Sequence, residues 1–317
     1  NKQKHLRLSA FTYTSKAHQT NKEINMLDIV SKNDYDFPVE MVELEAINTE
    51  GQVGEDNYKV PKDLARACVR TDTGQVLGIH GSKYKPINHN TVVNTIESSV
   101  DKMLATLNKS IDSEDIDYKV KVYDNGAKMR GSYTFKNLVI QPKLDDIVAF
   151  RINFFNSYDQ SWAFQSIADG LRLWCLNGCT TPATATKVRY KHTTKVSIDC
   201  VKQKMIDGFN YFNDQEGTFK MYAHTDVQDH TVESFFKQTL CKTFTRSTSS
   251  MPWNMFQFEE LMRQYDKEKS TLGSNLWAVY NTMTHWATHV GNHKTQKRRE
   301  DDVAKALSSP ATIFIGA

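Results

Sequence analysis

The chain has 317 residues, of which 39% are hydrophobic and 24% are charged. That length is enough for one large domain or two ordinary ones, each with a buried core. No run of about 18 apolar residues is present to span a bilayer, and no signal-peptide core follows the basic N-terminus. Composition therefore argues against membrane and secreted proteins, and we expect a cytoplasmic location.

Five cysteines, Cys68, Cys175, Cys179, Cys200 and Cys241, are an odd number for a disulfide framework, so we expect reduced thiols. The net charge of +3 is too small to indicate a polyanionic partner by itself. The distribution is more informative, because acidic clusters gather outside the middle of the chain. The segment from Lys119 to Lys204 is markedly basic, which makes it the candidate functional surface.

Hydropathy patterns divide the chain into three parts. Residues 1–36 are predicted to form a polar arm, residues 37–227 an α+β core domain, and residues 228–317 a helical C-terminal region with an apolar tail. Within the core, residues 37–47 suit a strand, and two short apolar runs around Asp72-Thr73-Gly74 predict a hairpin. Helical spacing then predicts a helix from about residue 90 to 107, with Asn90 or Thr91 as its N-cap.

From Ile116 the apolar period changes from 3.6 to 2, which predicts a strand. Asn125-Gly126 is typical of a hairpin turn, and the return strand continues to about residue 136. One face of this hairpin is apolar and is expected to pack on a helix. The other face is basic and would carry Lys119, Lys121, Arg130 and Lys136.

Two further strands, residues 146–155 and 161–168, follow with a turn predicted at residues 156–160. A loop follows in which basic residues recur at about every second position. Amphipathic helices are predicted from Val201 onward. The predicted fold is α+β, with a twisted antiparallel sheet of at least four strands packed against helices and a mainly helical C-terminal region.

Four segments, "NSYDQSWAF", "GLRLWCLNGC", "RYKHT" and "LWAVYNTMTHW", resemble the family called domain of unknown function 932, found on phages and plasmids. The resemblance implies a setting in DNA replication or recombination without implying a reaction. The order of helix, twisted hairpin, further strands and helix is also similar to the ring-forming single-strand annealing proteins of phages, among them Red-beta, Erf and Sak. That second similarity is at the level of fold and constrains function poorly.

These observations predict a protein of phage replication or recombination that binds single-stranded DNA without strong sequence preference, needs no cofactor, forms a homo-oligomer and contacts other replication or recombination proteins. Such proteins combine a positive groove for phosphates with rings that stack on bases. The candidate cationic residues are Lys119, Lys121, Arg130, Lys136, Arg151, Arg172, Lys187, Arg189, Lys191, His192 and Lys195, and the candidate rings are Phe155, Tyr158, Trp162 and Tyr190. Binding and annealing need the same surface and are not separated by sequence.

Within this set, Tyr158 is expected at an exposed turn tip, so Tyr158→Ala should weaken binding with little effect on stability. Phe154, Trp162 and Phe164 are expected to hold the sheet to its core, so Trp162→Ala should mainly destabilise the fold. Arg172 lies in an apolar run, where an unpaired charge is costly. It either reaches a phosphate or pairs with an acid such as Asp169 or Asp159.

Two other functions stay open. Cys175, Cys179, His192 and Cys200 could assemble a zinc site, although only one closely spaced cysteine pair is present. No catalytic motif appears, and adjacent carboxylates such as Asp145-Asp146 point apart on a regular element. Alternatively, the chain could be a structural or partner-binding protein, with the helical C-terminal third and its tail as the interaction elements. His285, His289 and His293 share one helical face there and are interpreted as surface or packing residues.

Overall fold

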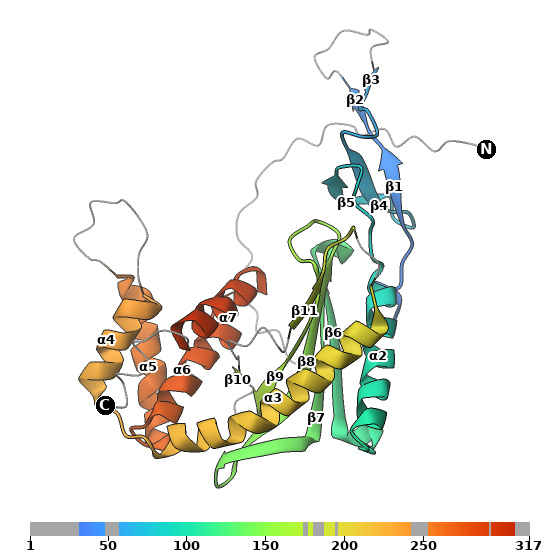
Figure 1. Cartoon of the computed structure of the whole chain (residues 1–317). Helices are drawn as coiled ribbons and strands as arrows, with labels where there is room; N and C mark the ends of the chain where they lie inside the picture. The colour runs from blue at the N-terminus through green and yellow to red at the C-terminus, as the bar shows by residue number, and fades with distance from the viewer. Residues whose placement is uncertain are drawn as a thin grey trace.

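A computed structural model describes residues 32–47, 57–173, 177–179, 187–193, 196–241, 253–291 and 293–307. The fold is α+β, as predicted, and is built on a curled antiparallel sheet (Figure 1). Its strands are β6 (Ile116–Tyr123), β7 (Lys128–Lys143), β8 (Asp146–Ser157), β9 (Phe164–Arg172), β10 (Asn177–Cys179) and β11 (Lys187–Tyr190). Five strands follow the order β10-β9-β8-β7-β6, and β11 pairs with β9 beside β10.

The β6–β7 hairpin has the predicted turn. Asp124, Asn125 and Gly126 form a short 3-10 turn with φ values of 51°, 56° and 104°, the left-handed region that asparagine and glycine tolerate best. The predicted turn at residues 156–160 was misplaced at its start. β8 continues through Asn156 and Ser157, whose Oγ accepts a hydrogen bond from the Trp162 amide across the connection to β9.

Two small sheets precede the main one. β1 (Val39–Glu43), β4 (Arg66–Arg70) and β5 (Gln75–His80) form an antiparallel sheet in the order β1-β4-β5, which includes the predicted hairpin. The predicted strand over residues 37–47 is two strands, because β2 (Glu45–Ile47) leaves β1 and pairs with β3 (Asn57–Lys59). A short helix, α1 (Lys32–Tyr35), lies before β1.

Two helices cover the apolar face of the main sheet, as predicted for the hairpin (Figure 1). They are α2 (His89–Thr106) and α3 (Ile198–His224), and α2 begins after Asn88 rather than after Asn90 or Thr91. The Phe150 ring of β8 packs against Phe209 and Phe212 of α3, with ring centroids 5.2 and 5.4 Å apart. In β7, Met129, Gly131, Tyr133 and Phe135 are buried, as their predicted place on the apolar face requires.

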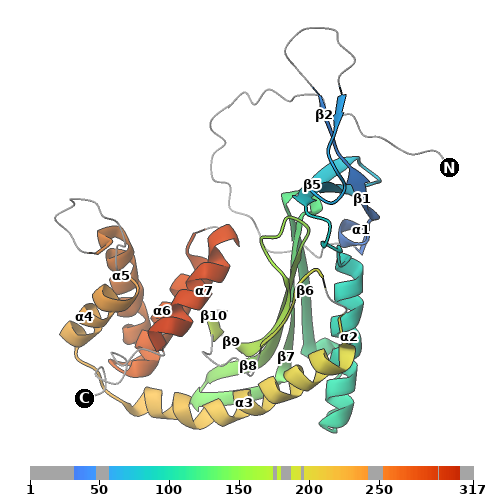
Figure 2. The ribbon, with the colours of Figure 1, turned by 45° about the horizontal axis from the view of Figure 1, so that its top comes forward.

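The C-terminal region is helical, as predicted. It comprises α4 (Asp229–Thr239), α5 (Met255–Leu272), α6 (Leu276–His289) and α7 (His293–Leu307), and α7 contains the charged run of the sequence. The long helix α3 runs from the sheet to these helices (Figure 2). One hydrophobic core includes Phe150 of the sheet, Phe219 of α3 and Trp277 of α6, so the two regions share buried contacts.

Helix length and hydropathy determine whether a helix of the chain could cross a membrane. Over the residues that the structure describes, none of the helices is both long enough and apolar enough to cross a bilayer. The predicted polar arm lies almost entirely outside the described residues, as does the C-terminal apolar tail, residues 311–317.

Candidate nucleic-acid interface

The face of the main sheet opposite α2 and α3 carries an ordered row of residues. Opposite positions on antiparallel strands point to the same face, so the register identifies the neighbours directly. The row, which we call the basic row, crosses five strands and consists of Lys121, Arg130, Phe155, Gln165 and Arg189. Its cations are Lys121 and Arg189 at the two ends and Arg130 inside the row.

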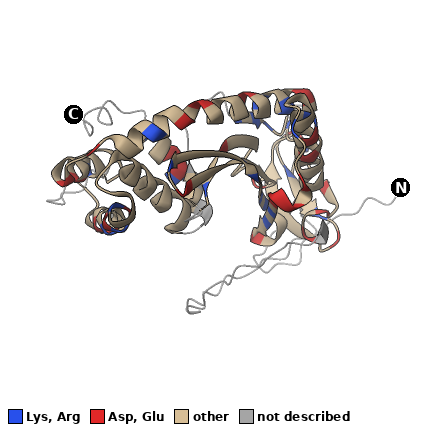
Figure 3. Cartoon of the chain, turned by 90° about the horizontal axis from the view of Figure 1, so that it is seen from below, with Lys and Arg blue, Asp and Glu red and all other residues tan. Residues whose placement is uncertain are grey.

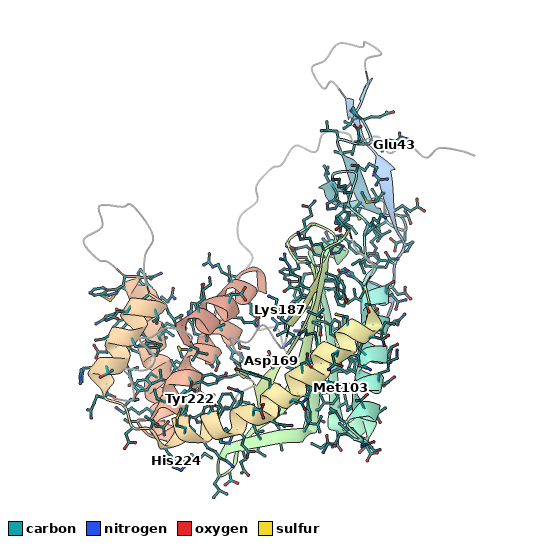
Figure 4. All side chains as sticks on the ribbon, viewed as in Figure 1. Glu43, Met103, Asp169, Lys187, Tyr222 and His224 are labelled. Atoms are coloured by element: carbon teal, nitrogen blue, oxygen red, sulfur yellow. The ribbon has the colours of Figure 1, made fainter. Side chains whose placement is uncertain are left out.

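A second row lies beside the first, two residues further along each strand. It consists of Lys119, Ser132, Asn153, Ile167 and Lys187. The register thus confirms that Lys119, Lys121 and Arg130 share a face, and it adds Lys187 and Arg189 to that face. Figure 4 shows Lys187 and Asp169 on the side of the sheet toward α6 and α7. Lys119, Lys121 and Arg189 are exposed, whereas Asn153, Phe155 and Gln165 at the centre are buried.

Several cations of this face already have acidic partners. Arg130 Nη2 lies 3.2 Å from Glu300 Oε1 of α7, and the Arg130 guanidinium lies over the Phe155 ring at 5.0 Å from its centroid. Lys119 pairs with Asp117 at 2.7 Å, an exposed pair of little energetic weight. Lys121 and Arg189 have no ion pair within the part of the chain that the structure describes. They are therefore the cations of the basic row most available to an anion.

Lys136 and Lys191 were also predicted as binding residues. Both are exposed, and Lys136, six residues along β7 from Arg130, donates to the Glu114 carbonyl at 2.9 Å. Lys195 lies outside the described residues. Seen from below, basic and acidic residues are interspersed over the surface rather than separated into two halves (Figure 3).

At the β11 end of the basic row the surface opens into a pocket of about 520 Å³. It lies between the segment after β5, the β8–β9 connection and the end of β11. Its lining combines cations with rings: Asp63, Gly81, Ser82, Lys83, Tyr84, Gln160, Trp162, Ala163, Arg189, Lys191, His192 and Thr193. Arg189 belongs to both features, so the pocket continues the basic row.

Two rings of the lining, Tyr84 and His192, belong to a stack of three rings that is completed by His80 behind the pocket. Tyr84 lies between His80 and His192, with centroids 3.7 and 5.1 Å away and both interplanar angles at 11°. Gln160 Nε2 lies 2.6 Å from His80 Nδ1, which holds the histidine ring in place. Burial, with a smaller contribution from His80, lowers the pKa of His192 to about 4, and burial also lowers the pKa of His80. Both histidines are therefore neutral at pH 7, and the positive charge of the pocket comes from Lys83, Arg189 and Lys191.

Trp162 is only half-buried, contrary to the prediction that it belongs to the core. Its ring meets Phe155 and Tyr123 edge to face, with centroids 5.7 and 6.4 Å away, while one part of it lines the pocket. Phe154 and Phe164 are fully buried, as predicted. Tyr190 stacks on Phe164 and exchanges hydrogen bonds with Ser197, so it belongs to the α3 side of the sheet.

The prediction for Tyr158 was wrong, because this ring is fully buried. Its hydroxyl accepts a hydrogen bond from the His89 amide at 3.0 Å, and its ring packs against Phe37 and His89. The N-terminal segment before β1 and the start of α2 together cover the position that looked like an exposed turn tip.

Arg151 was also expected on the working surface, but it is buried. Its guanidinium binds Asp169 through two hydrogen bonds of 2.8 and 3.0 Å, and Asn153 donates to the same carboxylate. The two residues are directly opposite on β8 and β9, on the basic-row face, and the Arg151 guanidinium lies against Gly178 of β10. Arg151 is therefore a structural residue of the sheet.

Arg172 pairs with acids, which was one of the two alternatives, but not with Asp159 or Asp169. It lies 2.6 Å from Asp146 and 2.9 Å from Glu268 of α5 and is 2% exposed. Asp146 also accepts a hydrogen bond from the Trp277 indole at 2.6 Å. This buried network joins the sheet to α5 and α6 and leaves Arg172 without access to a phosphate.

Over the described residues, no three histidine, cysteine, aspartate or glutamate residues form a group suited to a metal. Cys175 and the side chain of Cys179 lie outside the described part of the structure, so the zinc hypothesis remains untested at its cysteine pair. Cys68, Cys200 and Cys241 are free thiols, as predicted; Cys68 and Cys241 are buried and Cys200 is exposed.

Sequence reasoning missed Lys83, Tyr84 and Gln160. The available signal was the alternation of cations and a ring in Lys83-Tyr84-Lys85, directly after Gly81. Two of the four segments quoted above, "NSYDQSWAF" and "RYKHT", line the pocket. The other two, "GLRLWCLNGC" and "LWAVYNTMTHW", meet where Asn177 donates to the Asn281 carbonyl, near the Arg172 network.

Comparison with known proteins identified the family but no individual relative. Neither the curated proteins nor the solved structures contain a match to the chain. The model of one family, described as a domain of unknown function (DUF932), matches residues 76–308. That segment includes the main sheet, both helices on its apolar face and the C-terminal helices. The chain therefore belongs to the DUF932 family.

Proposed function

We propose that this protein binds single-stranded DNA along the basic row and in the adjoining pocket, without strong sequence preference. The observation that carries the proposal is the register of the sheet, which aligns Lys121, Arg130 and Arg189 on one face and leads to a pocket with rings and further cations. A phosphate-tracking surface beside stacking rings is the usual combination in single-strand binding.

The dimensions suit a flexible strand. Neighbouring strands lie about 4.8 Å apart, so the four steps from Lys121 to Arg189 span roughly 19 Å. Phosphates can reach the exposed ends of that length, at Lys121 and Arg189, and the half-buried Trp162 offers part of its ring in the pocket beside Arg189. A rigid duplex keeps its bases stacked inside and gains nothing from such a ring, so single strands are favoured.

The proposal extends to strand annealing in phage replication or recombination by a homo-oligomer, which is the setting implied by the sequence resemblance. Annealing needs the bases of a bound strand to remain accessible for pairing. Exposed cations at the two ends of the basic row, Lys121 and Arg189, would hold the backbone of a strand and leave its bases free to pair. Mixing complementary strands with the protein and following duplex formation tests this extension separately from binding, and sedimentation analysis tests the oligomer.

The primary test is fluorescence anisotropy with labelled single- and double-stranded oligonucleotides over a salt series. We expect single strands to bind more tightly, with an affinity that falls steeply as salt rises. Lys121→Gln and Arg189→Gln should each weaken binding and reduce the slope of log affinity against log salt by about 0.7, the contribution of one single-strand phosphate.

Lys220→Gln on α3 is the matched control, since it removes one exposed lysine away from the sheet face. It should leave the slope near that of the unmodified protein. Absence of binding at low salt would refute the proposal. Equal effects of the control and the two row variants would show that only the net charge of the protein matters.

A further inference from the structure

A second pocket lies on the other face of the sheet, between α2 and the edge strand β6. Its volume is about 460 Å³, and its lining consists of Tyr35, Val93, Asn94, Glu97, Ser113, Ile116, Tyr118 and Tyr133. Three tyrosines and one carboxylate therefore converge from α1, α2, β6 and β7. This pocket shares no residue with the basic row or its adjoining pocket, so an inference about it is independent of the proposed function.

The tyrosines form a connected group of rings. Tyr118 and Tyr133 are directly opposite in the β6–β7 ladder, with ring centroids 4.7 Å apart and planes inclined by 40°. Tyr35 of α1 lines the same pocket beside them. Tyr35 and Tyr133 are nearly buried, whereas Tyr118 is 40% exposed. The pocket therefore presents ring surface to an incoming group through an accessible side.

The charges around these rings are negative. Glu97 lines the pocket, and Asp101 lies one helical turn further along α2. Burial raises the pKa values of the Tyr118 and Tyr133 phenols, and the nearby Glu97 carboxylate raises both further, so the phenols stay neutral. Glu97 has no ion pair with any residue that the structure describes. The one lysine nearby on α2, Lys102, turns away to Asp199 of α3 at 3.3 Å.

We propose that this pocket binds an organic cation, a guanidinium or alkylammonium group. The faces of aromatic rings attract such cations, and groups of aromatic rings are a common way to recognise them. The unpaired Glu97 carboxylate supplies the counter-charge at the rim, and the phenol oxygens can accept hydrogen bonds from N–H donors. An anion or a purely apolar group would gain neither interaction, so the chemistry of the lining selects for positive charge.

The test uses the full chain labelled with 3-fluorotyrosine, whose ¹⁹F signals report directly on the rings. Tyr35→Phe, Tyr118→Phe and Tyr133→Phe assign the three signals. Methylguanidinium chloride is titrated as the cation and N-methylurea as a neutral molecule of nearly the same shape, with sodium chloride added to equalise ionic strength. We expect saturable shifts of the three pocket signals with methylguanidinium and none with N-methylurea.

Two variants then test the lining. Glu97→Gln should weaken methylguanidinium binding about tenfold, since it removes the charge and keeps the shape. Tyr118→Leu should weaken it severalfold by removing one ring. Glu97 is exposed, so Glu97→Gln should keep the melting temperature of the unmodified protein. Tyr118→Leu removes a ring that contacts Tyr133, so it should lower the melting temperature while the chain stays folded. Asp199→Asn is the control, because it removes a nearby carboxylate that does not line the pocket.

A blocked peptide with a single arginine separates the two sources of such a cation. Tighter binding of the peptide assigns the pocket to a side chain of a partner protein, and tighter binding of methylguanidinium assigns it to a free small cation; both outcomes support the proposal. Equal shifts with methylguanidinium and N-methylurea would overturn it, as would an affinity unchanged in Glu97→Gln. Neither outcome bears on DNA binding by the opposite face.

Discussion

Arg130 of β7 and Glu300 of α7 form an ion pair, with the Nη2 and Oε1 atoms 3.2 Å apart, at the inner cation of the basic row. Both side chains are largely buried, at 17% and 14% exposure. The same guanidinium covers the Phe155 ring. Helix α7 thus holds and neutralises one cation of the basic row, so Glu300 would oppose DNA binding under the proposed function.

We expect Glu300→Gln to tighten single-strand binding severalfold. The change releases Arg130 from its carboxylate while Gln keeps the size of the side chain, so one more cation can neutralise a phosphate. The slope of log affinity against log salt should steepen by about 0.7. Anisotropy titrations over a salt series measure both quantities.

Glu233→Gln on α4 is the matched control, since it removes one carboxylate from an exposed lysine pair elsewhere. A gain in affinity that is equal in the two variants would contradict a specific role for Glu300, because it would reflect net charge alone.

Trp162 should contribute to binding more than to stability. The side chain is half-buried and lines the pocket beside Arg189. Trp162→Leu should weaken single-strand binding about tenfold or more, because a stacked base contributes roughly 1–3 kcal/mol. The loss should persist at high salt, since stacking does not depend on released counterions. A variant that loses stability but binds as tightly as before would return Trp162 to the core role expected from the sequence.

Tyr158 should behave in the opposite way. Tyr158→Ala removes a fully buried ring and should lower the free energy of unfolding by about 3–5 kcal/mol, as for other large aromatic truncations. Tyr158→Phe keeps the ring and leaves the His89 amide without its acceptor, so it should cost about 1–2 kcal/mol. Urea unfolding measures both. Weaker DNA binding by Tyr158→Phe with unchanged stability would favour the exposed tyrosine that the sequence suggested.

The fold was predictable where local patterns control it. Alternation from Ile116 to Phe135 identified the basic and apolar faces, and Asn125-Gly126 located the turn between them. The register that aligns Lys121 with Arg189 was not predictable, because it depends on how four successive strand pairs meet.

The site was predictable in its residue types but not in their burial. Tyr158 is covered by Phe37 and His89, which come from segments far away in the sequence. Arg172 finds partners 26 and 96 residues away, and nothing local distinguishes those acids from Asp169. Arg151, Arg172 and Arg189 all lie in strands of similar composition. Arg151 and Arg172 are buried and Arg189 is exposed only because of contacts with residues far away in the sequence.

Arg172 is expected to be essential for stability. Arg172→Met would leave Asp146 and Glu268 as two buried acids without their cation, so the free energy of unfolding should fall by about 3–5 kcal/mol. Arg189→Met, an exposed arginine of the same sheet, is the control and should change stability by less than about 0.5 kcal/mol. Urea unfolding measures the free energy of unfolding of both variants. Equal stability of the two variants would show that the buried network contributes little.

Acid should destabilise the protein between pH 6.5 and 4. Burial lowers the pKa of His89 and of His192 to about 4, whereas an unfolded histidine titrates near 6.5. In that interval the unfolded chain binds protons that the folded chain excludes, so stability falls as pH falls and these two groups add no further change below pH 4. Each contributes on the order of 3 kcal/mol over the interval.

His192→Phe should flatten this profile, because phenylalanine keeps a ring stacked on Tyr84 and cannot take up a proton. The exposed His224→Gln is the matched control and should leave the profile unchanged. Urea midpoints measured at a series of pH values give the slope for each protein. A slope that is identical in His192→Phe and the unmodified chain would mean that the stack at the pocket stays intact when His192 is protonated, and that other groups control the acid response.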